Sequence, residues 1–517
     1  MARAARFLQW TCLGLAALAF FTLPETSFPP LTRLTNSLVA PLAAIPLGLL
    51  AVLWLIPYLL KRGAWPVETG PLVIFILVCL LSSGAAFFLD TTFYKNRDLL
   101  DQGIRAYLTM AVGMLFYFTL SAWLQDEKRL RRGLQAIQAG MAVAIVFAFV
   151  QGYFMILRDH QYPLLFREIR NAILYSLPHI QDGRRITGLT YEPSWYAHQL
   201  NMLFLPIWFS ATYLRTSVFP VRIWKFSVEN LLLIPGLVSL FFAGPRIGLI
   251  ALMVVIVFLF FRVNQAVIQR INTRVTQHGE PTARVRLSPR ITKALIGAGM
   301  LVLYVVFLTA AIALASRLDT RVSDMLASQI LPEHWAGLMK GDENTLIIVG
   351  ARYQFGERFI YWLTGWHIFN AYPFLGVGLG NAGFHFISQM PASSWMSLEI
   401  RQLLYLQNTL PNIKNLWVRL LAETGMLGFS TFCAWLLVLW RSANASLRST
   451  KPALRIAAMA GQLGLVAFLV EGFSIDSFAM PYLWVCTALI ASAGAIFRAQ
   501  TAARIDTPIE TDPPAGQ

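Results

Sequence analysis

The sequence predicts an all-α protein that crosses a membrane many times. Of its 517 residues, 56% are hydrophobic and only 13% are charged, and the mean hydropathy is +0.57. Its apolar runs are close to the roughly 20 residues that a helix needs to cross the hydrocarbon core. In that core only helices and closed barrels satisfy their own backbone hydrogen bonds. These observations exclude an ordinary soluble domain.

About twelve apolar runs can each form a spanning helix, with boundaries accurate to roughly 2 to 4 residues. They cover residues 7–23, 37–60, 70–90, 105–124, 134–157, 196–214, 228–243, 246–263, 294–316, 416–440, 456–475 and 479–497. The first run follows Arg3 and Arg6 and has no clear small-residue cleavage site, so we expect an uncleaved anchor rather than a secretory signal.

These runs divide the chain into six segments. Spans one to five lie in residues 1–157, an outer loop in 158–195, spans six to nine in 196–316, a long outer loop in 317–411, spans ten to twelve in 412–497 and a cytoplasmic tail in 498–517. The long loop is too rich in aromatic residues to be disordered. We therefore expect it to form helices of its own before the tenth span.

Lysine and arginine accumulate in alternate loops, which indicates that those loops face the cytoplasm. The basic segments are residues 61–62, 128–132, 215–225, 262–293 and 441–455. Both termini are then cytoplasmic, and the outer loops lie on the other side of the cell inner membrane. The net charge of +16 follows this distribution, so we expect membrane lipids, and not nucleic acid, as the partner of most basic residues.

The sequence shows no metal-binding or disulfide pattern. The four cysteines lie in apolar spans, at Cys12, Cys79, Cys433 and Cys486. The histidines are scattered, and no outer loop carries an Asp-x-Asp that would hold a metal against a sugar diphosphate. We therefore expect no cofactor and a metal-independent mechanism.

Four motifs place ionisable and aromatic residues at predicted outer ends of spans, where such residues are costly and often functional. The first reads Arg-Arg-Ile-Thr-Gly-Leu-Thr-Tyr-Glu-Pro-Ser-Trp-Tyr-Ala over residues 184–197, and the second reads Gly-Pro-Arg-Ile-Gly over 244–248. The third joins Gly356-Glu357-Arg358 and Trp362 to a glycine-rich run at 373–381. The fourth reads Lys-Asn-Leu-Trp-Val-Arg-Leu-Leu-Ala-Glu-Thr-Gly-Met-Leu-Gly over 414–428.

In this order the motifs resemble those of the O-antigen ligase and O-antigen polymerase family. They are similar to the family's Arg-x-x-Gly, its Ser-x-Ser-Arg-x-Gly, its Arg-x-x-x-Trp with Pro-Leu-Leu-Gly-x-Gly, and its His-Asn-x-x-Leu-x-x-x-x-Glu-x-Gly-x-x-Gly. The resemblance implies an inverting membrane glycosyltransferase that acts on undecaprenyl-diphosphate-linked oligosaccharide at the outer face. A glycan acceptor is implied as second substrate, with flippase and chain-length regulator proteins as candidate partners.

Lys414 departs from the family pattern, because the family's ligases carry a histidine at this position. Lysine can replace the positive charge of that histidine but is a poor base unless it is desolvated. This favours a polysaccharide polymerase. A ligase that moves glycan to lipid or protein is the alternative within the family, and a polysaccharide or lipid transporter is the alternative from another class, although the two halves show no repeat.

The predicted catalytic residues are Arg185, Arg246, Lys414 and Glu192. Arginine suits a diphosphate leaving group because its planar fork binds phosphate oxygens bidentately. At a membrane boundary it can equally extend to lipid headgroups. Glu192 can accept the proton of the acceptor hydroxyl, cap the helix that begins at Pro193, or pair with Arg185.

The predicted substrate-binding residues are Arg358, Arg184, Tyr191, Trp362 and Asn415. The aromatic members can stack on sugar rings or belong to the interfacial aromatic belt.

Two further expectations concern packing. Arg419 and Glu423, four residues apart on one helical face, should pair with each other. Glu471, near the outer end of the eleventh span, has no obvious partner in the sequence.

Overall fold

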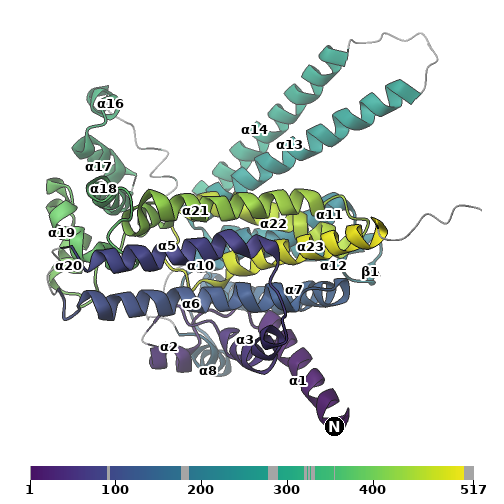
Figure 1. Cartoon of the computed structure of the whole chain (residues 1–517). Helices are drawn as coiled ribbons and strands as arrows, with labels where there is room; N and C mark the ends of the chain where they lie inside the picture. Colours follow the sequence, from purple (N-terminus) through teal and green to yellow (C-terminus); the bar gives the residue numbers. More distant parts are fainter. Residues whose placement is uncertain are drawn as a thin grey trace, which may run out of the picture.

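The computed structural model describes residues 2–35, 37–89, 94–175, 185–277, 289–318, 323, 327, 332–353 and 355–505 (Figure 1). Helices form nearly all of the regular structure in these ranges. The strands there are β1 (Arg222–Ile223) and β2 (Phe226–Ser227), which pair as a short antiparallel hairpin. The predicted all-α membrane fold is confirmed.

Among the described residues, eight helices are long and apolar enough to cross a membrane. They are α1 (Ala2–Phe21), α5 (Gly70–Ala86), α6 (Leu99–Trp123), α7 (Glu127–Leu157), α13 (Arg246–Gln277), α21 (Leu416–Ser446), α22 (Pro452–Glu471) and α23 (Pro481–Ile505). The other predicted spans are also helical. They are α3 (Ala44–Leu50) with η1 (Ala51–Leu55) and α4 (Ile56–Leu60), α10 (Pro193–Gln199) with η3 (Leu200–Phe204) and α11 (Leu205–Leu214), α12 (Val228–Ala243), and α14 (Pro289–Leu318).

The long loop before the tenth predicted span folds into short helices. They are α16 (Pro332–Met339), α17 (Glu343–Arg352), α18 (Gly356–Ala371), η4 (Asn381–His385), α19 (Phe386–Gln389), η5 (Ala392–Met396) and α20 (Leu398–Tyr405). Elsewhere in the described ranges, the short helices are α2 (Pro29–Thr35), η2 (Val67–Thr69) and α8 (Leu164–Ile173). The expectation that the loop contains its own helices is confirmed.

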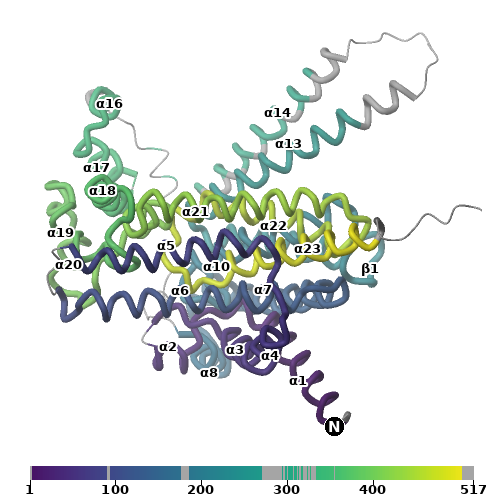
Figure 2. Tube along the Cα trace, in the orientation of Figure 1, coloured from purple at the N-terminus to yellow at the C-terminus, as the bar shows by residue number. Residues whose placement is uncertain are grey.

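The two ends of the helix bundle differ in what they carry. The helices α16 to α20 gather at one end, whereas the β1 hairpin and the C-terminal end of α23 lie at the other (Figure 2). The loop predicted to face outward and two segments predicted to face the cytoplasm are therefore at opposite ends of the bundle. We call the end that carries α16 to α20 the loop end.

Helix α22 lies at the centre of the bundle and is buried along most of its length. Small residues let its neighbours approach closely, as is common between helices in membranes. A Cβ added at Gly461 would lie 2.1 Å from Ile490, and one added at Gly464 would lie 2.3 Å from the carbonyl oxygen of Met202. The close contact with Met202 packs α22 directly against the η3 turn.

Two π-helical turns interrupt predicted spans, and each precedes a proline. Residues 51–55 are followed by Pro57, and residues 200–204 by Pro206. Proline has no backbone N–H, so the helix around it must rearrange its hydrogen bonds. The π turns accomplish this, and such turns occur frequently at functional sites.

Helix α21 is broken at Gly425, where φ is 62° and ψ is −166°. The glycine-rich run 373–378 fits into the break. Val377 and Gly378 donate their backbone N–H groups to the carbonyl oxygens of Ala422 (3.0 Å) and Glu423 (2.9 Å). In return, the backbone N–H of Met426 donates to the carbonyl of Pro373 at 2.8 Å. Through this exchange the glycine-rich run packs its backbone closely against α21 and fastens the long loop to the bundle.

We expect Gly425→Ala to lower the stability of the purified protein by about 2 kcal/mol or more, because alanine is strained at positive φ. Its Cβ would also lie 2.2 Å from the carbonyl oxygen of Phe374. The measurement is the unfolding temperature in detergent. Gly103→Ala in α6 is the matched control, since its Cβ would meet nothing within 4 Å and alanine favours a helix. Equal unfolding temperatures for both variants would contradict the role of the break.

The proposed sidedness can be tested with single cysteines at exposed positions. Met339 and Met396 are 87% and 82% exposed near α16 and η5, and Trp224 is 94% exposed in the β1 hairpin. Cysteines at 339 and 396 should react with an impermeant thiol reagent in intact spheroplasts, and one at 224 should react only after permeabilisation. The protein without an added cysteine gives the background. Labelling restricted to position 224 would reverse the orientation.

Candidate active site

Arg185 lies against the turn that joins α12 to α13. Its Nε donates a hydrogen bond to the carbonyl oxygen of Ala243, the last residue of α12, at 2.7 Å. Gly244 follows with a φ of 57°, and α13 begins at Arg246. The left-handed glycine ends the first helix and Pro245 precedes the second, so the turn is short. The first two motifs, nearly 60 residues apart in the chain, therefore meet at this turn.

Arg246 contacts the junction between α17 and α18. Its Nη1 donates to the carbonyl oxygen of Tyr353 at 2.7 Å, and its guanidinium carbon lies 4.5 Å from the centre of the Phe355 ring. Phe355 immediately precedes α18, the helix that carries Arg358 and Trp362. The second motif is thereby connected to the third.

Lys414 lies at the start of the fourth motif and faces a residue of α20. Its Nζ is 2.7 Å from Oε1 of Glu399 and 4.4 Å from the centre of the Tyr361 ring. The hydroxyl of Tyr361 donates to the same Glu399 oxygen at 2.8 Å. Arg358 is adjacent, since its Nη1 donates to the carbonyl oxygen of Lys414 at 3.4 Å. The third and fourth motifs thus share one corner.

The charges at this corner determine the protonation state of the Glu399 carboxyl group. Burial opposes its ionisation, but the Lys414 ammonium, the Tyr361 hydroxyl and the Arg358 guanidinium together lower the pKa of its carboxyl below the ordinary value. Burial and the neighbouring Glu399 charge both raise the pKa of the Tyr361 hydroxyl, so this group stays protonated. The ionised Glu399 therefore forms an ion pair with Lys414.

Asn415 has a structural role that the sequence analysis did not assign. It is the N-cap of α21, where its Oδ1 accepts hydrogen bonds from the backbone N–H groups of Trp417 (3.0 Å) and Val418 (3.2 Å). The side chain is fully buried, and its Nδ2 has no hydrogen-bond partner in the described chain. Its oxygen is therefore committed to the cap, and only the Nδ2 group remains for a ligand.

Glu192 precedes α10 but does not cap it through its side chain. Instead its Oε1 accepts a hydrogen bond from the hydroxyl of Ser194. Its neighbour Tyr191 is buried between the rings of Tyr175 and Trp195, with ring centres 6.4 Å and 5.4 Å away. Burial, with the adjacent Glu192 charge, raises the pKa of Tyr191 to about 12.

Trp362 is half-buried in an aromatic cluster. Its ring centre lies 5.5 Å from those of both Phe359 and Phe473, which joins α18 to the end of α22. Its indole Nε1 has no hydrogen-bond partner in the described chain and is buried. Arg184, the remaining predicted binding residue, lies outside the described residues.

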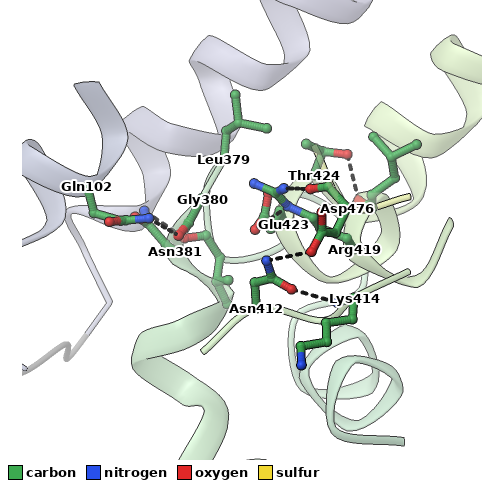
Figure 3. Close-up of polar contacts among 12 residues, drawn as sticks. Gln102, Leu379, Gly380, Asn381, Asn412, Lys414, Arg419, Glu423, Thr424 and Asp476 are labelled. Carbon is green, nitrogen blue, oxygen red and sulfur yellow. Dashed lines mark hydrogen bonds and ion pairs between the residues drawn. The ribbon is translucent and has the colours of Figure 1, made fainter. Parts of the chain in front are cut away.

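A second polar cluster lies beside the broken part of α21 (Figure 3). Arg419 Nε is 3.0 Å from Oε1 of Glu423, and Arg419 Nη1 also donates to the backbone carbonyl of Asp476. The predicted pairing of Arg419 with Glu423 is confirmed. Asn412 connects this cluster to the Lys414 corner, because its Nδ2 donates to Asp476 Oδ2 at 3.0 Å and its Oδ1 accepts from the Lys414 backbone at 2.8 Å. The Lys414 side chain itself points away from the cluster in Figure 3.

The sequence analysis missed a buried cluster around Glu471. Glu471, which has no obvious partner in the sequence, has two in the structure: His198 Nδ1 lies 2.7 Å from its Oε2 and Asn201 Nδ2 donates to its Oε1 at 2.6 Å. All three side chains are buried. The sequence did carry one signal for this cluster, because His198 and Asn201 are polar residues three positions apart in an apolar run and therefore lie on one helical face. Their pairing with α22 required the tertiary structure.

Taken together, the loop end of the bundle carries four cationic side chains from separate motifs: Arg185, Arg246, Arg358 and Lys414. In the described part of the chain, no three His, Cys, Asp or Glu side chains are grouped so that they could hold a metal ion. The positive charge available to an anionic ligand here comes from the guanidinium and ammonium groups. These can bind phosphate oxygens through charge-assisted hydrogen bonds.

Residues 231–433 match the model of a family described as O-antigen ligase. The matched region contains Arg246, Arg358 and Lys414, whereas Arg185, His198 and Glu471 lie outside it. The match confirms the family resemblance of the second, third and fourth motifs, which it covers, and associates the region with glycosyltransferase-like enzymes. No curated protein matches the chain.

Proposed function

We propose that this protein is a polysaccharide polymerase that transfers oligosaccharide from undecaprenyl diphosphate to an acceptor glycan at the outer face of the cytoplasmic membrane. The observation that supports this most directly is that side chains connect the four motifs in space. Arg185 reaches the turn before Arg246, Arg246 reaches the start of α18, and Arg358 reaches Lys414. Two of these links lie inside the O-antigen ligase match.

The arginines suit the chemistry of this transfer. The acceptor hydroxyl oxygen forms a bond to the anomeric carbon while the bond from that carbon to the phosphate oxygen breaks, and the electron pair leaves with the lipid diphosphate. Negative charge on the diphosphate grows in the transition state, where fixed cations lower the barrier. A single displacement of this kind inverts the anomeric carbon and needs no metal if the cations supply the charge.

An apolar groove provides a place for the lipid part of the donor. It has a volume of about 740 Å³ and is lined by α13, α21 and α22, with Phe258, Trp417 and Phe473 among its side chains. The same three helices carry Arg246, the Lys414 turn and Glu471 at their ends nearest the loop helices. A polyprenyl chain in this groove would therefore place its diphosphate beside the cationic side chains.

The matched family is described as O-antigen ligase. The family's ligases carry histidine where this chain has Lys414, and this difference is our reason for proposing a polymerase. The deciding experiment incubates purified protein with lipid-linked repeat units. A ladder of longer lipid-linked chains supports the polymerase. Transfer of one glycan to a different acceptor would establish the ligase instead. If no new glycosidic bond forms, only the transporter alternative remains.

We expect Arg185→Lys and Arg246→Lys each to reduce the transfer rate at least roughly tenfold, about 1.4 kcal/mol of barrier, although charge is kept. A compact ammonium cannot reproduce the bidentate fork of arginine. Initial rates of ladder formation are the measurement, and Arg222→Lys, exposed in the β1 hairpin, is the control. Near-native rates in both variants would assign the two arginines to headgroup contacts and packing.

For Lys414, we expect Lys414→Ala to reduce transfer by about 100-fold and Lys414→Arg by less than about tenfold, because arginine keeps the charge next to Glu399. The same rate assay measures this, with Lys340→Ala, an exposed lysine near α17, as the control. If Lys414→Arg is as inactive as Lys414→Ala, the residue acts as a neutral base, since arginine does not give up its proton.

A further inference from the structure

A buried carboxylate and a buried imidazole face each other between α10 and α22. Glu471 is 0% exposed and His198 is 2% exposed, and the contacting atoms, Oε2 and Nδ1, are 2.7 Å apart. An ionisable pair inside a membrane protein is costly to bury, and such residues usually mark a functional site. None of the steps assigned to the arginines and Lys414 uses this pair.

The contacts of Glu471 orient the histidine ring. One carboxylate oxygen faces His198 Nδ1, and the other accepts from Asn201 Nδ2 at 2.6 Å. A carboxylate at Nδ1 favours the tautomer with its proton on Nδ1 and leaves the lone pair of Nε2 available. In the described chain no protein group is hydrogen-bonded to that Nε2. An imidazole held in this way is suited to accept a proton.

Hydrogen bonds connect the pair to both parts of the cationic site. Asn201 Nδ2 also donates to the carbonyl oxygen of Gly248 at 2.7 Å, two residues beyond Arg246. On the other side, the carbonyl oxygen of Gly472 accepts from the backbone N–H of Leu416 at 2.8 Å, two residues beyond Lys414. The π turn η3 contains Asn201 and begins two residues after His198. The pair therefore lies where the outer ends of α13, α21 and α22 come together.

We propose that His198, oriented by Glu471, accepts the proton of the acceptor hydroxyl during glycan transfer. This inference rests on the proposed function. As the hydroxyl oxygen bonds to the anomeric carbon and the lipid diphosphate leaves with the electron pair, the hydroxyl proton passes to Nε2 of His198. The base is thus supplied by α10, because Lys414 is paired with Glu399 and Glu192 already accepts a hydrogen bond from Ser194.

The test compares His198→Gln, Glu471→Gln and the double variant in the full-length protein, using lipid-linked repeat units as donor. Glutamine at 198 can still donate to Glu471 but cannot take up a proton. Glutamine at 471 can donate to His198 Nδ1, which places the ring proton on Nε2. Each single variant should lower kcat by about 100-fold or more, with the donor KM within about threefold of native. The double variant should be no slower than either single variant, since the two residues act as one unit.

Gln199→Met is the matched control. Gln199 is the next residue on the same helix and is fully buried, and neither polar atom of its side chain has a hydrogen-bond partner in the described chain. Methionine has a similar length and leaves no polar atom to satisfy. This variant should keep native kcat and a native unfolding temperature, which separates loss of the base from disturbance of the buried helix.

Stability of each variant with and without donor completes the test. Retained stabilisation by the donor, together with the fall in kcat, supports the proposal. A kcat for His198→Gln within tenfold of native would overturn it. Losses that multiply in the double variant, or a lower unfolding temperature with a raised donor KM in both single variants, would also overturn it and make the pair a packing contact. If the native protein forms no glycosidic bond with any lipid-linked donor, the proposed function itself fails.

Discussion

The break in α21 is the constraint on which the arrangement of the candidate site depends. A continuous helix would use the carbonyl groups of Ala422 and Glu423 internally. At Gly425 the chain leaves the helical conformation, and the glycine-rich run 373–378 takes up those hydrogen bonds. A buried backbone group must find a partner, especially within a membrane, so the break and the run stabilise each other. The long loop is thereby fixed to the bundle close to Lys414.

This attachment has consequences for the charged groups around it. Arg358 and Tyr361 lie on α18, which leads directly into the glycine-rich run, and Glu399 lies on α20 beyond it. Their positions against Lys414 follow from where the run is held. The junction before α18 covers Arg246 through Tyr353 and Phe355. The loop helices therefore do more than cover the bundle, since they set the electrostatic environment of residues from three motifs.

Polar groups inside the bundle are paired by residues that are distant in the sequence. His198 and Asn201 contact Glu471, which lies 273 and 270 positions later in the sequence. Similarly, Glu68 pairs with Arg498, 430 positions later. Such contacts supply hydrogen-bond partners to polar atoms that the packing removes from water.

The sequence by itself determined the fold class, the positions of the spans and the order of the motifs. These depend on local properties: the length of an apolar run, the excess of basic residues in a loop, and the spacing of Arg419 and Glu423 on one helical face. The same local rules predicted the 196–214 span, although it carries the polar residues His198, Gln199 and Asn201, which are buried in the structure. They also left three roles open for Glu192, and the structure excludes one of them, because the side chain does not cap α10.

Only the tertiary structure decided which charges meet. From the sequence Lys414 could act as a charge or as a base, and the structure places it in an ion pair with Glu399, 15 residues earlier. Glu471 had no partner within reach along its own helix, and both of its partners come from another span. A carboxylate in a membrane is stabilised by whichever donors the packing brings within about 3 Å, and that distance depends on the folding of the whole chain rather than on neighbouring residues.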